Sequence, residues 1–180
     1  MGDLLETLTD KHIEWALSQK LFFVSTAPSA EGGHINCSPK GGDCFAFLDQ
    51  DSFIYADYTG SGNETIAHLH ENGRILIMFC SFEGPPRIMR LHGSGTALFP
   101  GHEDFERYSN QLPANLGLRS IIHTKIQRAS VSCGYSVPLF KFVGQRDLLD
   151  KWATRGQKEL LPTGRRRIRQ VLMVFQAMVN

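Results

Sequence analysis

The segment that follows Tyr58 has the residue types of an anion-binding helix start. A glycine-containing turn comes first, and Ser61 with Glu64 three residues later has the spacing of a capping box. Backbone N–H groups and the positive end of the helix dipole face outward at a helix start, so a phosphate fits there. Asn72-Gly73 predicts a left-handed end for this helix. A capped helix without a ligand gives the same pattern, and the Gly-Lys-Ser/Thr of a P-loop is missing.

A second charged group stands at the end of an earlier strand-like run. In Ser38-Pro39-Lys40-Gly41-Gly42 the lysine follows the run directly and lies beside flexible glycine backbone. An ammonium group on such a turn is a point charge that can reach a phosphate. The alternative is an ordinary solvated turn lysine.

A third set of polar groups lies on the long run from residue 87 to residue 98. Strand alternation places Arg90, His92, Ser94 and Thr96 on one face, and Met89, Leu91 and Ala97 on the other. His92 is the candidate catalytic residue for proton transfer, because the ordinary pKa of histidine is close to neutrality. A surface or interface role for this polar face is the alternative.

No hydrolytic or metal-binding motif accompanies these residues. The chain lacks G-x-S-x-G, H-E-x-x-H and paired carboxylates in an apolar setting. Its cysteines, Cys37, Cys44, Cys80 and Cys133, are scattered, so we expect reduced, mostly buried thiols and no metal site. A metal at Cys37 and Cys44 with His34, or a nucleophilic Cys133, is the alternative. We expect a bound cofactor to supply the chemistry.

The elements that must position these groups are mostly strands. Short aromatic and β-branched runs bounded by turn residues predict strands at 21–26, 34–38, 44–48, 52–58, 75–80, 87–98 and 121–131. Helices are expected from Leu4 to Leu17, near Asn63, at 104–111 and at 148–153. Many short strands at close intervals predict a mainly β fold, an antiparallel barrel or sandwich with peripheral helices.

The composition is that of an ordinary folded protein. The chain has 180 residues, of which 42% are hydrophobic and 21% charged, and its formal net charge is +1. This balance gives no reason to expect nucleic-acid or membrane binding, and the basic run Arg165–Arg167 is interpreted as a solvated tail. No apolar stretch approaches the roughly 18–20 residues that span a bilayer, and the N-terminus has no signal-peptide pattern. We therefore expect a cytoplasmic protein.

From about Leu21 to Gly156 the sequence resembles the pyridoxamine 5'-phosphate oxidase-like flavin-binding split barrels. The segments that carry the resemblance are Asn36–Gly41, Tyr58–Thr65 with Asn72–Arg74, Pro86–Gly93 and Cys133–Pro138. The resemblance implies a six-stranded antiparallel split barrel and a homodimer with two FMN sites at the subunit interface. It divides the chain into an N-terminal helical segment (1–19), an FMN-binding barrel (20–156) and a basic tail (157–180).

The resemblance also implies a set of flavin-binding residues. These are Asn36, Cys37, Ser38, Lys40, Thr59, Ser61, Gly62, Asn63, Arg87 and Arg90. Ser38 and Lys40 match ligands on the phosphate side, and the backbone of Asn36 and Cys37 matches the strand along the isoalloxazine ring. The two arginines match a strand that faces the flavin across the dimer. Residues 61–63 are neutral where oxidase members carry basic residues, so the helix start and Lys40 must neutralise more of the anion's charge.

The leading interpretation is an FMN-dependent oxidoreductase that acts on an unknown small substrate. A true pyridoxamine phosphate oxidase is not expected, because the C-terminal pattern with which that enzyme binds pyridoxal phosphate is missing. A flavin carrier or sensor without turnover, or a binder of haem or a deazaflavin, is the alternative. Gln170–Ala177 stands where relatives carry Ser-Ile-Asp-Gly-Leu-Pro-Gly, and codons in a neighbouring frame can spell that motif. A frameshift is therefore a hypothesis that the DNA sequence tests.

Overall fold

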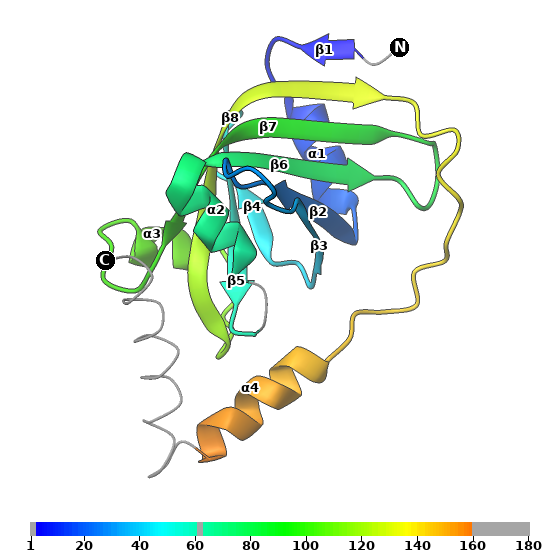
Figure 1. The fold of residues 1–180 in the computed structure, drawn as a ribbon. Coiled ribbons are helices and arrows are strands. Elements are labelled where there is room, and N and C mark those ends of the chain that lie inside the picture. The colour runs from blue at the N-terminus through cyan, green and yellow to red at the C-terminus, as the bar shows by residue number, and fades with distance from the viewer. Residues whose placement is uncertain (1–2, 61–62, 160–180) are drawn as a thin grey trace. The chain divides into compact units, whose positions relative to one another are not determined.

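The computed structural model describes residues 3–60 and 63–159, and its main feature is an antiparallel sheet curled into a split barrel (Figure 1). Within these residues eight strands join in the order β3-β2-β6-β7-β8-β5-β4, with β1 beside β8. The strands are β1 (Asp3–Leu5), β2 (Leu21–Thr26), β3 (Asn36–Gly41), β4 (Phe45–Phe47), β5 (Ser52–Tyr58), β6 (Arg74–Cys80), β7 (Ile88–Leu98) and β8 (Leu118–Ser132). The helices are α1 (Asp10–Ser18), α2 (Glu64–Asn72), α3 (Phe105–Ser109) and α4 (Leu148–Glu159). The mainly β fold class predicted from the sequence is confirmed.

The chain divides into two compact units. The first contains the sheet with α1, α2 and α3, and runs to Ala114 and again from Leu118 to Gln145. The second contains Asn115–Gly117 and the chain from Arg146, with α4. Within it, the Asn115 side-chain amide donates a hydrogen bond of 2.7 Å to the Asp150 carboxylate. All the site residues discussed below belong to the first unit.

An aromatic cluster fills the inside of the barrel. Along β2, Phe22, Val24 and Thr26 are buried while the residues between them are partly exposed, as alternation predicts. The Phe22 ring lies 5.0–5.6 Å, centroid to centroid, from the rings of Phe45, Phe53, Tyr55 and Phe79. Burying one such side chain contributes about 1.5–3 kcal/mol, so this cluster stabilises the sheet that carries the site.

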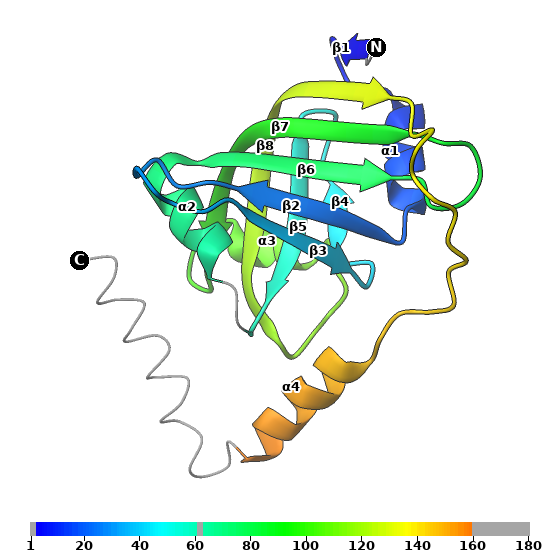
Figure 2. The same ribbon diagram turned by 45° about the vertical axis from the view of Figure 1, so that its right-hand side comes forward.

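Strand β8 lies where the sheet curls into a barrel. This strand pairs with β7 along one edge and with β5 along the other, and so joins the two parts of the curled sheet. A bulge in the β7–β8 pair lies between His92 and Gly93. A Cβ atom at Gly93 would stand 2.1 Å from the Lys125 carbonyl oxygen, so only glycine allows this close approach. Figure 2 shows β7 and β8 bending together where the sheet curls.

The N-terminal segment differs from the sequence prediction. A helix was expected from Leu4, but Asp3–Leu5 pairs with β8 as the short strand β1, and α1 starts only at Asp10. Strand pairing with Val131, Ser130 and Ala129 supplies backbone hydrogen bonds that an isolated first turn lacks. The second short strand, β4, likewise raises the count above the six strands that the resemblance implies. The split-barrel class is unaffected.

Strand β3 also differs from its predicted bounds. The run 34–38 was expected to end before Pro39, whereas β3 spans Asn36–Gly41 and includes that proline. In the described sheet β3 is an edge strand that pairs only with β2. A proline is tolerated at such an edge because its missing N–H takes no place in an inner ladder. Lys40 is therefore a strand residue, not a turn residue.

None of the helices in the described ranges, 3–60 and 63–159, is long and apolar enough to cross a membrane.

Candidate functional site

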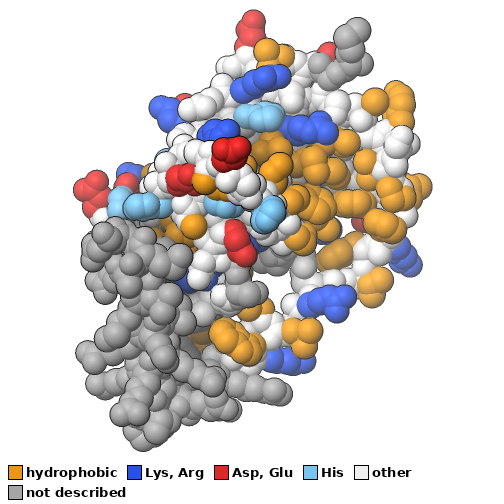
Figure 3. Space-filling model, in the orientation of Figure 1, with side chains coloured by type: hydrophobic (Ala, Val, Ile, Leu, Met, Phe, Trp, Pro, Cys, Tyr) orange, Lys and Arg blue, Asp and Glu red, His pale blue; other side chains and the backbone are white. Residues whose placement is uncertain are grey.

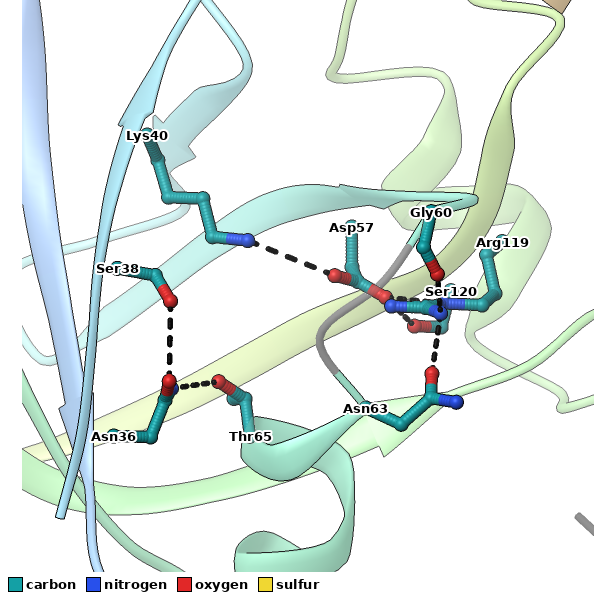
Figure 4. Close-up of polar contacts among 9 residues, drawn as sticks. All are labelled: Asn36, Ser38, Lys40, Asp57, Gly60, Asn63, Thr65, Arg119 and Ser120. Carbon is teal, nitrogen blue, oxygen red and sulfur yellow. Dashed lines mark hydrogen bonds and ion pairs between the residues drawn. The ribbon is translucent and has the colours of Figure 1, made fainter.

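The Asp57 carboxylate is the centre of a polar cluster near the end of β5. Its side chain is 4% exposed, and it accepts hydrogen bonds from Arg119 Nε at 2.8 Å and from Ser120 Oγ at 3.0 Å. Lys40 Nζ lies 3.8 Å from the other carboxylate oxygen. A buried carboxylate is costly unless it is paired and hydrogen-bonded, and these three groups meet that requirement. Asp57 thus joins β3, β5 and β8 at one point (Figure 4).

The inner face of β3 directs three polar side chains toward this cluster. The register pairs Asn36, Ser38 and Lys40 with Thr26, Val24 and Phe22, which are buried on the inside of the barrel. Ser38 Oγ donates to Asn36 Oδ1 at 3.3 Å. Asn36 Nδ2 donates to the Thr65 hydroxyl, in the first turn of α2, at 3.0 Å. The sequence analysis connected the β2–β3 hairpin and the start of α2 only because both could bind a phosphate. In the structure the two lie side by side.

The start of α2 is arranged differently from the predicted capping box. Asn63 is the N-cap residue, its backbone is in the α region, and its side chain makes no capping hydrogen bond. The Asn63 side-chain oxygen instead accepts a hydrogen bond from Arg119 Nη1, which also lies 3.4 Å from the Gly60 carbonyl oxygen. Ser61 and Gly62, both expected to bind the cofactor, lie outside the described residues. The left-handed end of α2 at Gly73, with φ of 70°, is confirmed.

Two buried titratable groups line the inside of the barrel next to Lys40. The Tyr55 hydroxyl is buried and has no hydrogen-bond partner in the described part of the chain, and Lys40 Nζ lies 5.7 Å from the centroid of its ring. Burial, followed by the Asp57 carboxylate, raises the pKa of Tyr55 well above its ordinary value. Burial also raises the pKa of Cys44 to about 11, against the opposing effect of Lys40. Both groups are therefore neutral at physiological pH.

The candidate catalytic residue lies on the other face of the sheet. His92 is opposite Leu76, Leu76 neighbours Ser25 on β2, and Ser25 pairs with Cys37 on β3. The same register argument puts Arg90 on this outer face, where its guanidinium donates to Ser132 Oγ at 3.0 Å. Partial burial, followed by the guanidinium groups of Arg128 and Arg90, lowers the pKa of His92 below its ordinary value. Within this chain, His92 and Lys40 therefore face opposite sides of the sheet.

The outer face is largely apolar around these groups. The registers place Phe23, Leu76 and Met78, all partly exposed, beside Arg90 and His92. Figure 3 shows hydrophobic side chains gathered over this part of the sheet, with basic and histidine side chains at the rim. The predicted alternation is confirmed for Met89 and Leu91, which are fully buried on the inside.

The remaining predicted residues with a described position, Arg87, Cys37 and Thr59, make no hydrogen bond or ion pair with Asp57. The Arg87 guanidinium stands 5.2 Å from the centroid of the Trp15 ring on α1. The Cys37 side chain is exposed, and only its backbone belongs to the strand beside the site. Thr59 is half-buried in the turn between β5 and α2. Sequence reasoning missed Asp57 and Arg119; a lone carboxylate inside the apolar run from Phe53 was the available signal, because such a group needs a buried partner.

Fold and site together define a class: a small split β-barrel in which a lysine-bearing edge strand faces the start of a helix. A family model described as pyridoxamine 5'-phosphate oxidase matches residues 8–133. Over 138 residues the chain is 46% identical to the pyridoxamine 5'-phosphate oxidase family protein ustO of Aspergillus flavus. The chain belongs to the pyridoxamine 5'-phosphate oxidase family. The match covers 74% of this chain but 55% of that relative, so the chain spans about half of the relative's length.

Solved structures agree at the level of the fold. HupZ of Group A Streptococcus superposes with a TM-score of 0.52 at 20% identity, over 68% of this chain and 91% of HupZ. A candidate pyridoxamine 5'-phosphate oxidase from Lactobacillus delbrueckii gives a TM-score of 0.55 at 12% identity, over 70% of this chain and 97% of that one. At these identities the likeness shows a shared split barrel and nothing finer.

Proposed function

We propose that this chain binds flavin mononucleotide through its phosphate at the start of α2, and that it is an FMN-dependent oxidoreductase acting on a small substrate. The observation that carries the proposal is the convergence of Lys40, Arg119 and the first turn of α2, which the Asn63 side chain does not cap, around Asp57. Lys40, Arg119 and Asp57 together carry a net charge of +1, and the one acidic side chain in the first turn of α2, Glu64, is exposed to solvent. The helix start adds roughly +0.5 of an elementary charge, which favours a dianion.

The residues present fit a phosphate better than a neutral group. The side-chain amide of Asn36 and the hydroxyl of Ser38 lie beside the same helix start and can donate hydrogen bonds (Figure 4). The buried hydroxyl of Tyr55, whose ring lies beside Lys40, has no hydrogen-bond partner of ordinary geometry among the described residues and is a further donor. Family membership supports a flavin as the carrier of that phosphate. A bound flavin would supply hydride transfer, and the protein would hold and orient it.

The opposite placement of Lys40 and His92 supports a dimeric site. If both residues serve one flavin, they must come from two protomers, because one sheet separates them within a protomer. The half-exposed apolar residues around Arg90 give the outer face the composition of an interface core. We therefore propose a homodimer in which one protomer holds the phosphate of the flavin and the other protomer contacts its ring.

The absorption spectrum of the purified protein, before and after addition of FMN, tests the proposal. Bands near those of oxidised flavin, followed by bleaching with NADH or NADPH and recovery with an acceptor, are expected of the oxidoreductase. Tight binding of FMN without reduction by any donor identifies a carrier instead. A protein that binds neither FMN nor riboflavin contradicts the proposal, and a haem or deazaflavin spectrum identifies the other ligands directly.

A further inference from the structure

The N-cap of α2 is unusual because its side chain is bound elsewhere. Asparagine is among the best N-cap residues, since its side-chain oxygen accepts from a backbone N–H of the first turn. Asn63 occupies that position, but its backbone is in the α region instead of the extended region of a capping residue, its side chain makes no capping bond, and its oxygen is bound by Arg119. Arg119 thus binds Asn63 in a conformation that does not cap the helix.

Arg119 is itself held firmly in the position that allows this. Its Nε is fixed by the buried Asp57 carboxylate at 2.8 Å, and its side chain is 12% exposed. From that anchor, Nη1 reaches both the Gly60 carbonyl oxygen and the Asn63 side chain. A planar guanidinium can make these bonds at once in fixed directions, whereas a lysine ammonium cannot reproduce the geometry.

We infer that Arg119 is a positioning residue that keeps the first turn of α2 open for the phosphate by holding Asn63 away from it. The inference rests on the proposed function for the identity of the anion. The donors in question are the backbone N–H groups of the first helical turn, which have no partner within the helix. The buried Tyr55 hydroxyl makes no hydrogen bond of ordinary geometry within the described residues, and it lies near the Thr65 side chain in that turn as a further donor.

A double-mutant cycle between Arg119 and Asn63 tests the inference. Without Arg119 the Asn63 backbone can become extended and its side chain can cap α2, so in R119M FMN binding should weaken roughly 10–100-fold while riboflavin, which lacks the phosphate, binds as before. N63G removes the competing cap, so the N63G/R119M protein should recover most of the lost FMN affinity. N63G alone supplies the fourth corner of the cycle. R119K, which keeps the charge but not the fork, should behave more like R119M than like the parent protein.

Other outcomes overturn the inference. Parallel losses for FMN and riboflavin indicate general damage to the barrel, and failure of N63G to restore FMN binding indicates that Arg119 acts on the phosphate directly. R119M also removes one partner of the buried Asp57 carboxylate. The D57N/R119M protein is therefore measured as well, because a neutral amide at position 57 does not need Arg119 as a charge partner.

Amide hydrogen exchange at Thr65 and Ile66 gives a reading that needs no ligand. Capping by Asn63 in R119M should slow exchange at one of these amides at least several-fold relative to the parent protein and to N63G/R119M. Unchanged exchange overturns the inference even if the protein proves not to bind FMN. Slowed exchange without FMN binding in the parent protein contradicts the proposed function alone.

Discussion

Lys40 Nζ lies 3.8 Å from the Asp57 carboxylate, and that carboxylate is shared with Arg119. The ammonium group is therefore held over the inner face of the barrel but is not tightly bound, since 3.8 Å is longer than a charge-assisted hydrogen bond. With 26% of its side chain exposed, Lys40 can turn toward an anion at the start of α2 without leaving Asp57 unpaired.

Replacing Lys40 with methionine should weaken FMN binding by about 1.5–3 kcal/mol, the range for a hydrogen bond to a charged group. Riboflavin binding should change far less, because the lost interaction is with the phosphate. Quenching of flavin fluorescence on titration measures both affinities. Lys125, an exposed lysine on β8, provides the matched control K125M. Equal FMN affinity of K40M and K125M at low salt would show that the phosphate binds elsewhere.

Mixing two defective variants tests whether each site is built from two protomers. K40M damages the inner face and R90M the outer face, so a hybrid dimer contains one site with both changes and one site with neither. After unfolding and refolding of an equal mixture, random pairing restores about a quarter of the sites to full FMN affinity. Stoichiometric titration with FMN measures that fraction. If no sites reappear in a mixture shown to contain hybrid dimers, the two faces do not serve one flavin.

The stability of the protein should depend on pH through His92. Burial and two arginines lower its pKa in the folded state, so the unfolded chain, with a pKa near 6.5, binds the extra proton first as the pH falls. The free energy of unfolding should therefore decrease as the pH falls through about 6.5 and below. Urea unfolding at pH 7.5 and pH 5.5 measures the difference.

The variant H92N should lose a smaller amount of stability over that interval than the parent protein. H70N, which replaces an exposed histidine on α2, is the control and should follow the parent. An H92N protein with the full pH dependence of the parent would show that His92 is not the group responsible.

The four thiols should fall into two kinetic classes. Cys37 and Cys133 are exposed, whereas Cys44 and Cys80 are buried, and burial raises the pKa of Cys44 to about 11 and also raises that of Cys80. Because the thiolate is the reacting form, the buried pair should react with Ellman's reagent only on unfolding. Absorbance at neutral pH should show two rapidly reacting thiols in the native protein and four in urea. C37S should lose one of the rapid pair; a third rapid thiol in the native protein contradicts this assignment.

The sequence predicted a candidate anion site from local features and missed the residues that join them. Lys40 and the helix start each have a short-range pattern, a lysine after a strand and a glycine turn before a helix, and the structure brings them together. Arg119 has no such pattern. The last strand was expected to start at Ile121, so this arginine fell outside it, whereas β8 begins at Leu118. Its link to Asp57 spans 62 residues of sequence and depends on the β5–β8 register, which composition cannot fix.

The placement of His92 was limited for a similar reason. Alternation along β7 correctly placed His92 and Leu91 on opposite faces of the strand. It does not reveal which of these faces lies on the same side of the sheet as Lys40, which belongs to β3. Two further strands, β6 and β2, lie between β7 and β3. The register of each strand pair decides which residues of the next strand face the inside of the barrel. A one-residue slip in any of them would exchange the two faces.

Pro39 sits in the middle of β3, at the free edge of the described sheet and one residue before Lys40. A strand with a missing amide makes a poor template for a foreign strand, so this border resists the edge-to-edge joining that leads to aggregates. The approach to Lys40 along that border thus stays clear of intruding backbone. Substituting Pro39 with a β-branched residue would complete the ladder and invite chains to stack there, closing the entrance by oligomerisation.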